Sequence, residues 1–224
     1  MNGKVRHPLR LTAMLYLLDY GAGNIQSLAN SLTKLGYTYE WVREPSDISK
    51  ADKLLFPGVG SFASAMDALH AKGYVEPLRA YIQSGKPLMG ICVGMQVLFE
   101  GSDESPGVPG LGIVPARVGR FATQDALGRK AVPHMGWSLA NVVEWDGCAD
   151  QRHELARSYG MHDSNPSHYY FVHSYRVAWD ANVAEWALTT TQYGNEVFVS
   201  SIQHANVFAT QFHPEKSGQA GLDL

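Results

Sequence analysis

Short apolar runs alternate with segments of helical periodicity throughout the N-terminal half of the chain. The spacing predicts one helix that begins after Asn24 as its N-cap and closes at Gly36, and another that is capped by Ser61. Strands that alternate with helices predict a flavodoxin-like α/β fold with a doubly wound, mostly parallel sheet. Ligands of such sheets bind beyond the carboxyl ends of the strands. The predicted strands are 15–19, 38–42, 52–56 and a run that ends at residue 92.

The pattern changes beyond Gly101. Gly and Pro become frequent over residues 107–115, and the apolar runs become shorter. His204-Ala205-Asn206 predicts a hairpin turn. We therefore expect an antiparallel section added to the sheet in the C-terminal half, with the polar segment 141–168 left unassigned. Its predicted strands are 117–121, 169–176, 187–192, 196–202 and 207–212.

The composition is that of one globular domain. The chain has 224 residues, 45% of them hydrophobic, and a net charge of -3, so no polyanionic partner is indicated. Its two cysteines, Cys92 and Cys148, are too few for a disulfide framework and suggest a reducing compartment. No apolar run is long enough to cross a bilayer.

The N-terminus is expected to stand apart from this domain. We divide the chain into an extension over 1–14 and a single domain over 15–224. The extension contains Lys4, Arg6 and Arg10 but no acidic residue. A cytoplasmic location is expected, or a plastid if the basic extension is the remnant of a transit peptide.

The first candidate for chemistry is the pattern Gly90-x-Cys92-x-Gly94, where an apolar run changes to a helical one. Glycines on both sides allow a sharp turn from strand to helix, which leaves Cys92 exposed at its apex. The N-terminus of the following helix, expected to run on to Glu100, favours a thiolate there. On this stretch alone, a cysteine that merely packs at the end of a core strand remains an alternative.

A histidine and an acid near the C-terminus favour the nucleophile. His213 and Glu215 are two residues apart, so on a strand their side chains share one face. An imidazole beside a carboxylate supplies the base and its orienting partner, which a cysteine nucleophile requires. A solvated pair in a turn is the alternative, and the elbow at Cys92 weighs against it.

Two further patterns weigh against cofactors and metals. The loop that begins at Gly58 matches Gly-x-Gly-x-x-Ala, but no acid ends a strand at the distance a dinucleotide site requires. Its backbone N–H groups are better suited to a developing oxyanion. His153, His162 and His168 lack the tight spacing of metal ligands. The sequence therefore predicts no cofactor and no metal.

Together these motifs resemble the triad-type, class I glutamine amidotransferases. The resemblance rests on the Gly-x-Cys-x-Gly-x-Gln elbow, the Pro-Gly-Val-Gly loop and the terminal His-Pro-Glu-Lys-Ser, and it covers about residues 15–222. Three more stretches resemble one branch of the family, which acts with a cyclase in histidine biosynthesis. These stretches begin at Asp19, Pro133 and Tyr170.

The resemblance implies a role for each matching position. Cys92 is the nucleophile, His213 the base and acid, and Glu215 the orienting carboxylate. The oxyanion hole is implied at Gly58, Val59, Gly60 and Val93. Substrate contacts are implied at Gln96, Glu104, His173, Ser174 and Tyr175, and partner contacts at His134, Met135, Trp137 and Lys216.

The implied reaction is hydrolysis of L-glutamine to glutamate and ammonia. The ammonia would pass to a (β/α)8 cyclase, a separate subunit or a fused domain, which makes imidazole glycerol phosphate and an aminoimidazole carboxamide ribotide. The family continues a final helix that begins near Ala220, so we expect that helix to be truncated here. The alternatives are another amidotransferase of the superfamily, a γ-glutamyl hydrolase that acts alone, and a degenerate domain that only binds a partner.

Overall fold

The computed structural model describes residues 13–21, 25–126, 128–144, 149–161 and 168–224. Most of the predicted extension lies outside these residues, as do Asn24, Cys148 and His162. In the described part of the chain, no helix has the length and apolar character needed to cross a membrane.

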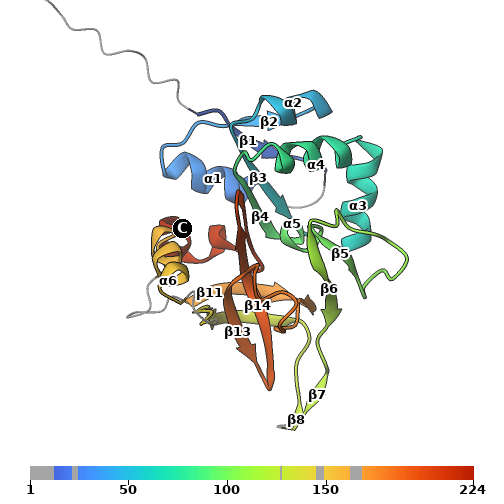
Figure 1. Cartoon of the computed structure of the whole chain (residues 1–224), viewed down its shortest axis with the longest axis vertical. Coiled ribbons are helices and arrows are strands. Elements are labelled where there is room, and N and C mark those ends of the chain that lie inside the picture. The colour runs from blue at the N-terminus through green and yellow to red at the C-terminus, as the bar shows by residue number, and fades with distance from the viewer. Residues whose placement is uncertain (1–12, 22–24, 127, 145–148, 162–167) are drawn as a thin grey trace, which may run out of the picture.

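An eight-stranded sheet forms the centre of the molecule (Figure 1). Five strands are parallel neighbours in the order β2-β1-β3-β4-β15, and three more continue the sheet antiparallel in the order β14-β13-β10. This parallel order is the flavodoxin-like one, so the predicted fold is confirmed. The strands are β1 (Leu15–Leu18), β2 (Glu40–Val42), β3 (Lys53–Gly58), β4 (Leu88–Cys92), β10 (Asn141–Val142), β13 (Ala187–Tyr193), β14 (Glu196–His204) and β15 (Val207–Thr210).

Strand β15 joins the two parts of the sheet. It was predicted within the antiparallel section, and it does pair antiparallel with β14. On its other edge, however, it runs parallel to β4, with Ala209 opposite Gly90. The strand that leads to the C-terminal histidine therefore lies directly beside the strand that ends at Cys92.

Helices cover both faces of the parallel strands, and in Figure 1 α1 lies to their left whereas α3 and α4 lie to their right. The predicted cap is confirmed, because the Ser61 hydroxyl accepts a hydrogen bond from the backbone N–H of Ser64. The described helices are α1 (Gln26–Lys34), α2 (Pro45–Lys50), α3 (Phe62–Ala71), α4 (Val75–Gln83), α5 (Val93–Gln96), α6 (Ala149–Ser158) and α7 (Gly218–Asp223).

The helix predicted after Cys92 is much shorter than expected. It ends at Gln96, and strand β5 (Phe99–Ser102) follows. The backbone carbonyl of Val97 accepts from the N–H of Leu111, and that of Leu98 accepts from Ile113. Pairing with a distant segment therefore competes with helix formation here and prevails over the local pattern.

Smaller sheets complete the C-terminal half beside the large one. Strand β9 pairs antiparallel with β11, and β6 pairs parallel with β5 and antiparallel with β12. A second hydrophobic core, which includes Phe171, Phe198 and Phe212, is buried in this half. These strands are β6 (Val114–Arg120), β7 (Gln124–Asp125), β8 (Gly128–Arg129), β9 (His134–Leu139), β11 (His168–His173) and β12 (Tyr175–Arg176).

Candidate active site

Cys92 occupies a strained turn between β4 and α5. It is buried, with 5% of its surface exposed, so the expectation that the turn leaves it exposed is wrong. Its φ of 54° and ψ of -110° fall where residues with a side chain are rarely found. Its neighbour across the sheet is Gly58, the last residue of β3. The turn carries a single cysteine thiol at the carboxyl end of the central strands, where the fold is expected to place a ligand.

Two glycines make this turn possible. A Cβ on Gly94 would lie only 1.9 Å from the carbonyl oxygen of Phe56, and one on Gly90 would lie 2.9 Å from the carbonyl oxygen of Gly94. Backbone therefore packs directly against backbone at both positions. The predicted close approach around Cys92 is confirmed.

His213 and Glu215 follow β15 and meet as expected, although by a different local structure. They lie not on a strand but at the 3-10 turn η1 (Pro214–Lys216). Nδ1 of His213 is 2.8 Å from Oε1 of Glu215, and both side chains are buried. The backbone holds this turn in place, because the N–H of His213 donates to the carbonyl of Tyr170 and its carbonyl accepts from the Ser217 hydroxyl.

Neighbouring charges determine the protonation of His213. Burial alone lowers the pKa of His213, but its interactions with Cys92 and with the carboxylate of Glu215 together raise it to about 10. At neutral pH the imidazole of His213 is therefore protonated. Since Nδ1 faces Glu215, Nε2 is the nitrogen available to Cys92.

Cys92 and His213 open onto one cavity of about 480 Å³, a volume suited to a small metabolite. All five residues predicted to contact substrate line this cavity, and so do three of the four predicted oxyanion positions, whereas Gly58 and Glu215 are not among its lining residues. The lining residues are Val59, Gly60, Cys92, Val93, Gln96, Glu104, Pro133, Val172, His173, Ser174, Tyr175, His213 and Lys216.

The carboxylate of Glu104 is fixed at the edge of this cavity. Its Oε2 accepts a hydrogen bond of 2.8 Å from the backbone N–H of Phe62, in the first turn of α3. This bond joins the loop after β5 to the segment that follows the Gly58–Gly60 loop. The Glu104 side chain is therefore held in place among the residues that line the cavity.

A buried glutamine that carried no predicted role contacts the nucleophile. Nε2 of Gln211 donates to Sγ of Cys92 at 3.6 Å, and its Oε1 accepts from Nε2 of Gln96 at 2.9 Å. Gln96 also donates to the carbonyl of Tyr175 at 3.2 Å. The sequence holds a signal for Gln211, because it precedes His213 by two residues and so shares its side of an extended chain.

His134 is buried rather than facing a partner. It lies at the start of β9 with 2% of its surface exposed, whereas Met135 is 62% and Trp137 54% exposed. Alternate residues of a strand point to opposite faces, so the expectation of a partner contact does not hold for the His134 side chain. Trp137 lies beside Tyr170, with ring centroids 6.1 Å apart, and Lys216 lies over the same tyrosine ring.

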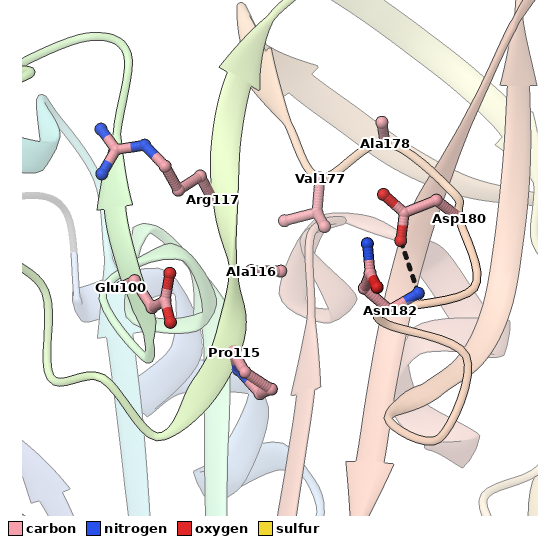
Figure 2. A pocket seen from close by; sticks show the side chains of 8 residues that line it. All are labelled: Glu100, Pro115, Ala116, Arg117, Val177, Ala178, Asp180 and Asn182. Atoms are coloured by element: carbon pink, nitrogen blue, oxygen red, sulfur yellow. Dashed lines mark hydrogen bonds between the residues drawn. The ribbon is translucent and has the colours of Figure 1, made fainter.

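A second hollow, of about 410 Å³, lies between β6 and the loop after β12 (Figure 2). Glu100, Arg117 and Asp180 line it with exposed side chains, and the backbone N–H of Asn182 donates to the Asp180 carboxylate. It contains no cysteine or histidine, so it lacks a nucleophile or base of the kind found at Cys92. Within the described residues, no three His, Cys, Asp or Glu side chains are grouped as a metal site.

Known proteins match nearly the whole chain. The family described as glutamine amidotransferase class-I matches residues 16–222. Imidazole glycerol phosphate synthase hisHF of Emericella nidulans is 48% identical over 211 residues, which cover 93% of this chain and 36% of that protein. The HisH subunit of imidazole glycerol phosphate synthase from Synechococcus sp. is 40% identical over 215 residues. The match covers 94% of this chain and 90% of that subunit.

Solved structures agree with the fold. A structure described as a glutamine amidotransferase superposes with a TM-score of 0.65 at 20% identity, and the match covers 93% of this chain and 94% of that one. The chain spans about a third of the length of the fused hisHF relatives and nearly all of the separate HisH subunits. It therefore belongs to the class I glutamine amidotransferase family.

Proposed function

We propose that this chain hydrolyses L-glutamine to glutamate and ammonia with Cys92, His213 and Glu215. The observation that carries the proposal is that Cys92 and His213 line the same cavity, with Nδ1 of a protonated His213 held 2.8 Å from Oε1 of Glu215. Acyl transfer to sulfur requires a cysteine nucleophile, a base beside it and an acid that orients the base.

In the first half of the reaction, the Cys92 thiolate attacks the side-chain amide carbon of glutamine. A C–S bond forms, and the carbonyl oxygen becomes an oxyanion. We assign its stabilisation to the backbone N–H groups of Val93 and of the Gly58–Gly60 loop. The proton on Nε2 of His213 passes to the amide nitrogen, the C–N bond breaks, and ammonia leaves a glutamyl thioester.

In the second half, neutral His213 accepts a proton from water as the water oxygen attacks the thioester. The C–S bond breaks, glutamate leaves, and the thiolate–imidazolium pair is restored. Glu215 keeps the imidazole in one orientation through both steps and stabilises its charged form. The proton released at one step is therefore returned to the same nitrogen for the next cycle.

The cavity contains groups that complement an amino acid. The Glu104 carboxylate is suited to the α-ammonium group of glutamine, and the backbone of His173–Tyr175 is suited to its α-carboxylate. Both N–H groups of Gln96 donate within the protein, so Gln96 offers the substrate its Oε1. These contacts would place the side-chain amide toward Cys92.

We also propose a (β/α)8 cyclase as the acceptor of the ammonia, either as a separate subunit or as a fused domain. Both arrangements occur among the relatives, as HisH subunits and as hisHF proteins. Ammonia remains nucleophilic only while unprotonated, so a closed route to the partner protects it. The products would be imidazole glycerol phosphate and the aminoimidazole carboxamide ribotide of histidine biosynthesis.

The test compares two nitrogen sources in the complete enzyme with its cyclase. Cys92→Ala should abolish synthesis from glutamine, by about four orders of magnitude or more for a lost nucleophile, and leave synthesis from ammonium salts intact. Loss of both activities would instead mean that Cys92 has a structural role. Full glutaminase activity without any cyclase would favour a hydrolase that acts alone.

A further inference from the structure

A continuous chain of hydrogen bonds runs from strand β9 to the sulfur of Cys92. It begins at Ser138 and His134, on the buried face of β9. It passes through His173 at the end of β11, which is opposite His134 in the register of the two strands. The Ser138 hydroxyl is 2.9 Å from Nε2 of His134, and Nδ1 of His134 is 3.2 Å from Nε2 of His173. Nδ1 of His173 is in turn 2.8 Å from the carbonyl oxygen of Tyr175.

The direction of every proton in the first part of this chain is fixed. Nδ1 of His173 is 2.8 Å from the carbonyl oxygen of Tyr175, which can only accept, so Nδ1 carries the hydrogen. Burial lowers the pKa of His173 to about 3, which keeps its Nε2 unprotonated. That nitrogen must therefore accept from Nδ1 of His134, 3.2 Å away.

His134 continues the same order of donors and acceptors. Burial, with a smaller effect from Lys130, lowers the pKa of His134 to about 4. Its Nε2 is thus unprotonated and accepts from the Ser138 hydroxyl at 2.9 Å. The ring is stacked between Phe171 and Tyr193, with centroids 5.1 and 4.1 Å away. It has no freedom to turn without breaking both bonds.

The second part connects the Tyr175 carbonyl to the nucleophile. Gln96 donates to that carbonyl and to Oε1 of Gln211, which in turn donates to Sγ of Cys92. Gln96 is 4% and Gln211 1% exposed, so water does not offer either amide an alternative partner. A change in position at the Tyr175 carbonyl is therefore transmitted to the sulfur.

We propose that His134 and His173 are positioning residues that fix the Cys92 sulfur through the Tyr175 carbonyl, Gln96 and Gln211, and so couple it to strand β9. The opposite face of β9 carries the exposed Met135 and Trp137. A partner that docks on these side chains shifts the strand and, through the two imidazoles, the nucleophile. The inference rests on the proposed function, because it concerns the efficiency of the same reaction.

The test uses the complete enzyme with its cyclase and the variant His134→Phe, which keeps the stacked ring and removes both hydrogen bonds. We expect the kcat for glutamine to fall about tenfold, a size typical of coupling between sites, with a change in KM of less than about twofold. We also expect a ligand bound to the cyclase to stimulate the glutaminase activity of the wild type, and this stimulation should fall together with kcat in His134→Phe. His134→Asn, whose amide nitrogen takes the place of Nδ1, should restore part of both.

Tyr193→Phe is the matched control. It keeps the ring that stacks on His134 and removes a hydrogen bond to the carbonyl of Ala131, which is not part of the chain. We expect its kcat and its stimulation to equal those of the wild type. A second readout is the rate at which a haloacetamide alkylates Cys92, which should change in His134→Phe and stay constant in Tyr193→Phe.

The outcomes separate this inference from the proposed function. The inference would be overturned if His134→Phe kept the wild-type kcat and the wild-type stimulation. It would also be overturned if kcat fell by the expected amount while the stimulation stayed unchanged. Either result leaves the proposed function standing if Cys92→Ala still abolishes glutamine hydrolysis. Unchanged synthesis from ammonium salts shows in every variant that the cyclase is docked and active.

Discussion

Nδ1 of His213 lies 2.8 Å from Oε1 of Glu215, and both side chains are shielded from solvent. This contact fixes which imidazole nitrogen faces Cys92 and adds to the charge that keeps the ring protonated. The two residues come from a single turn after β15, the strand that lies beside β4. Sheet pairing thus brings a short C-terminal motif to a cysteine that is distant in sequence.

Removal of the carboxylate charge should weaken this arrangement without removing it. Glu215→Gln keeps an oxygen for Nδ1 but no longer stabilises the imidazolium, so we expect kcat for glutamine to fall about 10²- to 10⁴-fold. Steady-state glutaminase kinetics measure the effect. Glu76→Gln, which breaks an exposed ion pair with Arg79, is the control and should leave kcat unchanged. A wild-type kcat in Glu215→Gln would contradict the role given to this carboxylate.

The buried histidine His173 should make the protein sensitive to acid. Burial lowers its pKa from 6.5 in the unfolded chain to about 3, so between these values only the unfolded state binds the proton. The free energy of unfolding is unaffected above pH 6.5 and falls as the pH is lowered, by about 2 kcal/mol between pH 6.5 and 5.

Urea denaturation at pH 7 and pH 5 measures this loss. In His173→Asn, which keeps a donor for the Tyr175 carbonyl and has no titrating group, the loss should be smaller by about that amount. The same pH dependence in wild type and variant would show that His173 titrates normally in the folded protein.

The glycine after the nucleophile should be irreplaceable for packing. Gly94→Ala places a Cβ 1.9 Å from the carbonyl oxygen of Phe56, so β3 and α5 must separate. We expect the free energy of unfolding to fall by about 3 kcal/mol or more. Gly107→Ala is the control, because a Cβ there meets nothing within 4 Å and its φ is not strained. Equal stability of the two variants would contradict the close packing at the elbow.

An exposed tryptophan on β9 should contribute to partner binding. Trp137→Ala removes a large apolar side chain that is 54% exposed, and we expect the Kd for the cyclase to rise about 30-fold with an unchanged Tm. Titration calorimetry or analytical sedimentation measures the affinity. Tyr37→Ala, 61% exposed and next to β2 at the far edge of the sheet, should not change it. Equal affinities in both variants would place the partner elsewhere.

Local patterns predicted the parts of the fold that depend on local physics. The apolar run before Cys92, the Ser61 cap and the glycines of the elbow each impose their structure on neighbouring residues. Helix α2 was not predicted, because its six residues bury only Ile48. A capping box between Glu44 and Asp47, rather than an apolar stripe, defines where it begins.

Features that depend on distant pairing were beyond these patterns. Phe99–Ser102 continues a helical pattern in the sequence, yet it forms a strand because its partner is Val114–Arg120. The burial of His134 depends on the aromatic cluster beneath β9, and the contact of Gln211 with the sulfur depends on β15 lying beside β4. Sequence motifs therefore identified the reactive groups, whereas the residues that position them emerged only from the packing.

The covalent intermediate provides the most direct test of the central claim, that Cys92 attacks glutamine. The complete enzyme is mixed with glutamine, quenched in acid during turnover and analysed by mass spectrometry of its peptides. We predict a glutamyl thioester on the peptide that contains Cys92, and none in His213→Asn mixed and quenched in the same way. Steady turnover of glutamine by Cys92→Ala, or a glutamyl group on any other residue, would contradict the account.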